Sequence, residues 1–137
     1  MIIDHQLQVS NEQTITTTAV STDVIDFGQA NPNSGMSDML DLSITVDQAV
    51  TAAGAATVTF VIQDSADNSS FADVVSTAAI GKAALRLGAQ VILKMPKTHR
   101  RFVRVNYVVG TGPLTAGRFS AQFVTGLQLN TPTPGQL

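Results

Sequence analysis

Five of the eight Lys and Arg residues gather in one short segment, QVILKMPKTHRRFVRVNYVVG, at residues 90–110. They are Lys94, Lys97, Arg100, Arg101 and Arg104, and His99 lies among them. Cationic side chains gathered in this way could bind nucleic acid, belong to a catalytic cluster, or dock on an acidic protein surface. Each of these functions requires further residues of a particular type elsewhere in the sequence.

Catalysis and nucleic-acid binding both lack the residues that would accompany them. Neither His5 nor His99 has a partner pattern around it, and no G-x-S-x-G motif occurs. Nucleic-acid-binding domains are usually basic, with aromatic side chains as stacking platforms, but this chain has a pI of about 5.4 and 5% aromatic residues. We therefore predict that the protein is not an enzyme and binds no nucleic acid.

Two polar segments have the composition of ligand-binding loops without their spacing. DSADNSS at residues 64–70 lacks the D-x-[DN]-x-[DN]-G pattern and the later Glu of a calcium loop, and is typical of a turn. GTGPLTAG at 110–117 departs from G-x-G-x-x-G and contains Pro113. With no cysteine in the chain, thiolate metal sites are excluded. We predict no cofactor, no metal and no small-molecule substrate.

Two interpretations of the basic cluster remain, a solvated strand edge and a docking patch for an acidic partner. Lys and Arg on an edge strand discourage aggregation, and Arg is enriched at interfaces. Pro96 should end a strand and leave 97–100 in an exposed connection, while Arg104 should point away from the core. Three arginines within five residues favour bidentate pairing with a partner. We predict a docking surface made of Lys97, Arg100, Arg101 and Arg104.

The charges also follow an order along the chain. All ten acidic residues, from Asp4 to Asp73, precede all eight basic ones, from Lys82 to Arg118. This order can mark a nucleic-acid-binding half, or it can mean that early and late strands lie side by side and pair their charges.

Alternation of apolar and polar residues indicates an all-β fold. It is clearest at residues 40–47, 57–64, 102–109 and 117–124, and weaker at 21–28, 72–80, 90–95 and near the N-terminus. About eight short strands without helical crossovers predict a β-sandwich or barrel with little or no helix. The expected core consists of Ile44, Val46, Val58, Phe60, Ile62, Val103, Val105, Phe119 and Phe123.

The chain should form one domain over residues 1–137. Residues 78–89 fit either a short helix or a loop, and the tail 130–137, rich in Pro and Thr, should be loosely held. No segment approaches the roughly 20 apolar residues of a membrane span, so we expect a soluble protein without membrane contact.

Four segments together resemble a known family. MIID at the start, STDVIDFG, QDSADNSSF and RRFVRVNYVVGTGPLTAGRFSA are similar to the small capsid cement, or decoration, proteins of tailed bacteriophages. The resemblance implies a jelly-roll β-sandwich on the outer capsid surface of the virion, made and assembled in the host bacterial cytoplasm. There it would bridge copies of the major capsid protein and stabilise the shell.

The expected partners are therefore the major capsid protein and the protein itself. A homodimer suits a two-fold position best, and a trimer is also compatible. The alternative function is a carbohydrate- or receptor-binding jelly-roll module of a phage tail or fibre. Such a module usually has exposed aromatic residues for sugar stacking, and this chain has no Trp and a single Tyr.

Overall fold

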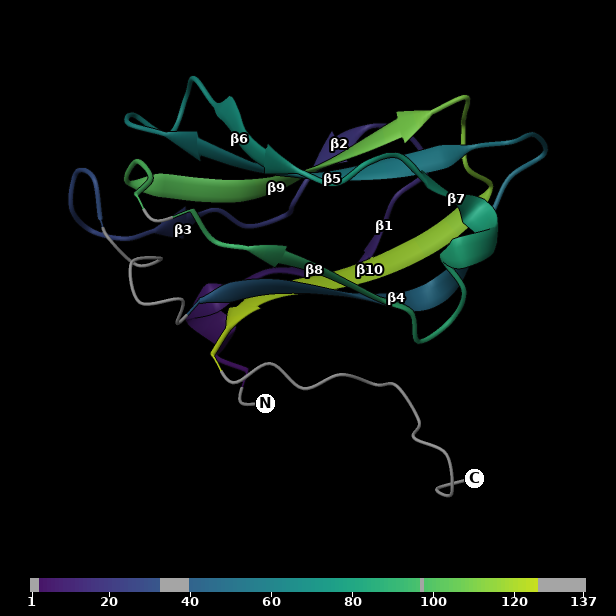
Figure 1. The fold of residues 1–137 in the computed structure, drawn as a ribbon, viewed down its shortest axis with the longest axis horizontal. Helices are drawn as coiled ribbons and strands as arrows, with labels where there is room; N and C mark the ends of the chain where they lie inside the picture. Colours follow the sequence, from purple (N-terminus) through teal and green to yellow (C-terminus); the bar gives the residue numbers. More distant parts are fainter. Residues whose placement is uncertain (1–2, 33–39, 97, 126–137) are drawn as a thin grey trace.

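The computed structural model describes residues 3–32, 40–96 and 98–125, and they form two antiparallel β-sheets packed face to face (Figure 1). One sheet has the order β1 (Gln8–Thr14), β10 (Ala116–Val124), β4 (Asp41–Thr51) and β8 (Gln90–Lys94). The other has the order β2 (Ala19–Val20), β9 (Phe102–Gly110), β5 (Thr57–Ser65) and β6 (Ala72–Ser76). Two further short strands, β3 (Ile25–Asp26) and β7 (Ile80–Gly81), pair with β9 and β5.

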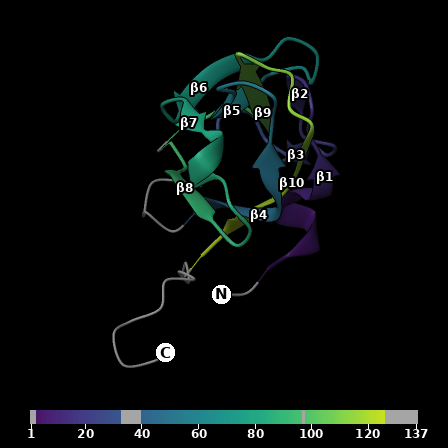
Figure 2. The same ribbon diagram turned by 90° about the vertical axis from the view of Figure 1, so that its right-hand side faces the viewer.

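The strand order is that of a jelly roll. Among the eight strands of the two sheets, the first pairs with the last (β1 with β10), and the second with the seventh (β2 with β9). The third pairs with the sixth (β4 with β8), and the fourth with the fifth (β5 with β6). This nested pairing is a long antiparallel hairpin rolled into two sheets. The end-on view places β6, β7 and β8 along one side of the sandwich and β1, β2 and β3 along the other (Figure 2).

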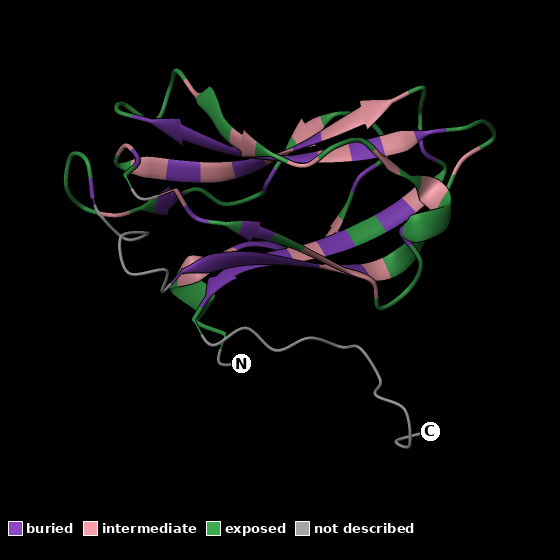
Figure 3. Cartoon of the chain, viewed as in Figure 1, coloured by how far each residue is buried: buried purple, intermediate pink, exposed green. Residues whose placement is uncertain are grey.

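The predicted core is confirmed residue by residue. All nine expected core side chains are at most 1% exposed, because alternation along four long strands turns them toward the opposite sheet (Figure 3). At the centre, the ring of Phe60 contacts Tyr107 and Phe119 edge-on, with centroids 5.8 and 5.4 Å apart. Tyr107 also donates a hydrogen bond to Ser10 Oγ at 2.8 Å, which joins the two sheets through the core. Burial raises the pKa of the Tyr107 phenol well above its ordinary value.

Several details differ from the sequence prediction. Within the described residues ten strands form instead of about eight. Segment 72–80 splits into β6 and β7, and β2, which pairs with β9, lies just before the predicted segment 21–28, which contributes β3. Within 78–89 the chain forms the 3-10 turn η2 (Lys82–Ala84), and another 3-10 turn, η1 (His5–Leu7), precedes β1. Asp41 and Ser43, on the outer face of β4, are buried instead of solvated. The residues that pair with Asp41 and Ser43 on the neighbouring strands β8 and β10 lie on either side of them.

The predicted loose tail, residues 130–137, lies outside the described part of the chain. Within that part, no helix is long and apolar enough to cross a membrane.

Candidate docking surface

The three arginines of the basic cluster lie at one end of the sandwich, in and after the connection that joins β8 to β9. Arg100 and Arg101 stand just before β9, and Arg104 is its third residue. Lys97, the remaining member of the predicted surface, lies outside the described residues. The loops after β3 and β5 reach the same end, and two open depressions there are lined by residues of all three connections, among them Asn31, Ala66 and Arg100.

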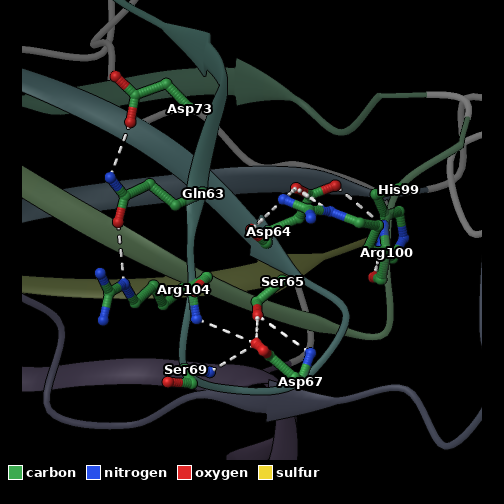
Figure 4. A network of polar contacts seen from close by, with 10 residues as sticks. Gln63, Asp64, Ser65, Asp67, Ser69, Asp73, His99, Arg100 and Arg104 are labelled. Carbon is green, nitrogen blue, oxygen red and sulfur yellow. Dashed lines mark hydrogen bonds and ion pairs between the residues drawn. The ribbon is translucent and has the colours of Figure 1, made fainter.

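Arg100 binds Asp64, at the end of β5, through four contacts. Its Nε and Nη2 lie 2.9 and 2.8 Å from Asp64 Oδ1, and Nη2 also donates to the Asp64 carbonyl at 2.9 Å (Figure 4). The Arg100 backbone N–H donates to Oδ2 at 2.9 Å. Asp64 is only 7% exposed, and it pairs in register with Val103, on the inward side of β9. The pair therefore fixes the β8–β9 connection to the end of the core.

Arg101 forms a bidentate ion pair with Asp26 of β3. Its Nε and Nη2 lie 2.7 and 2.9 Å from the two carboxylate oxygens, and the backbone N–H of Gly28 donates to Oδ1 at 2.8 Å. The hydrogen bond from Arg101, followed by that from Gly28, lowers the pKa of Asp26 to about 2. Both side chains of this pair are 44% exposed. The guanidinium also lies 5.0 Å from the centre of the Phe102 ring.

Arg104 points away from the core, as its place in the alternation predicts. Its Nε donates to Gln63 Oε1 at 2.9 Å, and its guanidinium lies 3.8 Å above the centre of the Phe71 ring. Gln63 in turn donates from Nε2 to Asp73 Oδ1 at 2.7 Å (Figure 4). Partial burial lowers the pKa of Arg104. Among the described acidic residues, none lies within ion-pair distance of this guanidinium.

The connection predicted to be exposed at residues 97–100 is exposed at Thr98, but it is half-buried at Arg100 and buried at His99, and Lys97 lies outside the described residues. His99 is only 5% exposed, and its ring packs edge-on against Phe27 with centroids 4.6 Å apart. Its Nδ1 lies 2.8 Å from the carbonyl oxygen of Arg100. These contacts hold the ring inside the loop, so His99 positions the backbone next to Arg100. The other histidine, His5, is exposed in η1.

The turn at residues 64–70 is built as the sequence predicts for a hairpin connection. The Asp67 carboxylate accepts hydrogen bonds from the backbone N–H groups of Ser69 and Ser70 at 2.9 and 3.0 Å, and from Ser65 Oγ at 2.8 Å (Figure 4). Several hydrogen bonds lower the pKa of Asp67 to about 2, and the one from the Ser70 backbone N–H has the largest effect. Asn68 adopts a left-handed backbone conformation, with φ +58°. Within the described residues no group of acidic or His side chains has the arrangement of a metal site.

The charge order along the chain appears in the structure as intramolecular ion pairs. Lys94 Nζ lies 3.4 Å from Oδ1 of Asp41, its register partner on β4. Arg100 binds Asp64, and Arg101 binds Asp26. Each pair joins an early acidic residue to a late basic one, which is the second interpretation of the order. The sequence did not identify Asp26, Asp64 or Gln63 as partners. The charge order pointed to early acidic residues as partners of the late basic ones, but it held no signal for Gln63.

A model of the protein family described as Bbp16 matches residues 9–123, which run from β1 into β10. No curated protein matches the sequence.

Proposed function

The chain belongs to the Bbp16 family, and from that premise we propose that it is a structural virion protein, a capsid cement protein that binds the outside of an icosahedral phage head. It would bridge neighbouring copies of the major capsid protein and so stabilise the shell. Two features support the proposal: the jelly-roll fold, and the resemblance of four of its segments to phage decoration proteins.

The observation that carries the proposal is the preorganised end of the sandwich. Arg100 and Arg101 tie the β8–β9 connection to β5 and β3, segments that lie 36 and 75 residues away in the sequence. Loops held in place by such bonds lose little further freedom when they dock, so more of the contact energy is available for binding. A protein that works by contact with a shell needs a surface of this kind.

The arginines of this end could still bind a partner while they hold their carboxylates. A guanidinium has five N–H donors, and the bonds of Arg101 to Asp26 use Nε and Nη2. The Nη1 group can therefore donate to a backbone carbonyl or carboxylate of the capsid protein. Because Asp64 and Asp26 already balance the charges of Arg100 and Arg101, we expect head binding to depend only modestly on salt.

The experiment is binding to purified heads of the phage that encodes the chain, prepared without this protein. Protein and heads are mixed and sedimented together, and the bound protein is measured relative to the major capsid protein. The proposal predicts saturation at a fixed ratio. We call the end of the sandwich that carries Arg100 and Arg101 the docking end. Arg101→Glu changes an exposed side chain there and should weaken head binding at least about tenfold.

Arg86→Glu is the matched control, because Arg86 is also exposed but follows η2, away from the docking end. This variant should bind as the native protein does. The proposal fails if the native protein does not sediment with heads. If both variants bind equally well, the docking end is wrongly assigned.

A further inference from the structure

A row of three side chains crosses the outer face of the second sheet. Arg104 on β9 and Asp73 on β6 are both register partners of Gln63 on β5, which lies between those strands. The Gln63 amide accepts from Arg104 and donates to Asp73, as the close-up shows (Figure 4). Gln63 is 8% exposed, so the amide is fixed and holds a cation on one side of β5 and an anion on the other.

These two charges differ from the others at this end of the molecule because they are fixed but not neutralised. Arg100 and Arg101 each bind a carboxylate, whereas Arg104 binds an amide oxygen and an aromatic ring. Asp73 is exposed and forms no ion pair with any basic residue that the structure describes. Ordered Arg side chains on aromatic rings are frequent at protein interfaces, since little side-chain entropy remains to be lost.

The rest of this face is mostly uncharged. Toward the other end of the sheet, the accessible outward positions are Thr57 and Thr59 on β5 and Asn106 and Val108 on β9, whereas Val61 on β5 is only 4% exposed. The face thus combines apolar and neutral contact area with one fixed cation and one fixed anion, a composition that suits a protein interface.

We propose that a second copy of the chain binds this face, with a two-fold axis that runs along β5 above Gln63. Neighbouring strands lie about 4.8 Å apart, so Arg104 and Asp73 belong to strands at equal distances on either side of β5. A half-turn about the axis exchanges these sides, and Arg104 of each copy then meets Asp73 of the other. The interface contains two reciprocal ion pairs, as a two-fold contact requires.

The face is smaller than a standard stable interface. Strands β5 and β9 have nine residues each and β6 only five. At about 3.3 Å per residue and 4.8 Å per strand, these three strands cover roughly 360 Å² per copy. Standard stable interfaces bury roughly 800 Å² per partner. The dimer should therefore dissociate on dilution, and salt should weaken it because its ion pairs lie near solvent.

Sedimentation velocity of the purified protein over a range of concentrations tests the proposal independently of head binding. The native protein should show a monomer–dimer equilibrium. Arg104→Asp and Asp73→Arg each place like charges together twice per dimer, and each should raise the dissociation constant at least about tenfold. The double variant Arg104→Asp, Asp73→Arg restores opposite charges, and it should dimerise better than either single variant.

Arg118→Asp with Asp23→Arg provides the control, because both residues are exposed and neither lies on this face. That double variant should dimerise as the native protein does, and thermal unfolding of every variant confirms that it is folded. Three results would overturn the proposal: a native protein that stays monomeric at high concentration, a dimer insensitive to Asp73→Arg, or a charge swap that restores nothing. Insensitivity to Asp73→Arg would point to another interface, such as one made by β8, the last strand of the other sheet.

Discussion

The Arg100–Asp64 ion pair should contribute measurably to stability, unlike an ordinary surface pair. In Arg100→Met, the Asp64 carboxylate stays buried and loses its contacts with the guanidinium. Of its bonds to residue 100, only the one from the backbone N–H remains. Removal of one partner of a fully buried pair costs about 3–5 kcal/mol. Because 39% of the Arg100 side chain is exposed, water can replace part of the lost contact. We expect a loss of about 2–3 kcal/mol in the free energy of unfolding.

Urea unfolding of a double-mutant cycle measures this contribution. Asp64→Asn leaves Arg100 partly solvated and should cost about 1–2 kcal/mol, and the double variant should lose less than the sum of the singles by about 1–2 kcal/mol. Arg101→Met is the matched control, because its pair with Asp26 is open to solvent, and it should change stability little. Single variants that each cost under about 1 kcal/mol, with additive effects, would show that the Arg100–Asp64 pair contributes no more than a surface ion pair.

Three further predictions concern the core and the carboxylates. Phe60→Ala empties a fully buried site and should cost about 3–5 kcal/mol in urea unfolding; a loss under about 1 kcal/mol would contradict the packing. Tyr107→Phe removes the hydrogen bond to Ser10 between the sheets and should cost about 1 kcal/mol, whereas unchanged stability would argue against that bond. Asp26 and Asp67 have pKa values of about 2 in the fold, below the ordinary 3.8. Their contribution to stability is complete above about pH 4 and is lost as the pH falls through about 2, so thermal midpoints should drop over that range, and less in Asp67→Asn.

The long strands could be predicted from the sequence because apolar residues on one face alternate with polar residues on the other. Strands β4, β5, β9 and β10 each have nine residues or more, enough for several periods of apolar and polar residues. Strands β2, β3 and β7 have two residues each, too few for a period. They form because the longer strands β9 and β5 offer them a hydrogen-bonding edge, which is a tertiary effect.

The individual contacts of the candidate site could not be predicted, because they depend on strand register. The charge order indicated that early acids meet late bases, but the choice of Asp64 for Arg100 requires knowing which residues of β5 and β9 lie opposite each other. The same holds for Arg104 and Gln63, 41 residues apart, and for Tyr107 and Ser10, 97 apart. Burial of His99 likewise depends on Phe27, which a different connection supplies.

If the protein reinforces the shell, it should raise the temperature at which DNA leaves the heads. Heads that lack the protein are heated with increasing amounts of it, and released DNA is detected with a dye that cannot enter intact heads. For a cement protein, the release temperature should rise as protein is added and reach a plateau at the ratio where head binding saturates. A release temperature that does not change while the protein is bound at saturation would contradict reinforcement of the shell.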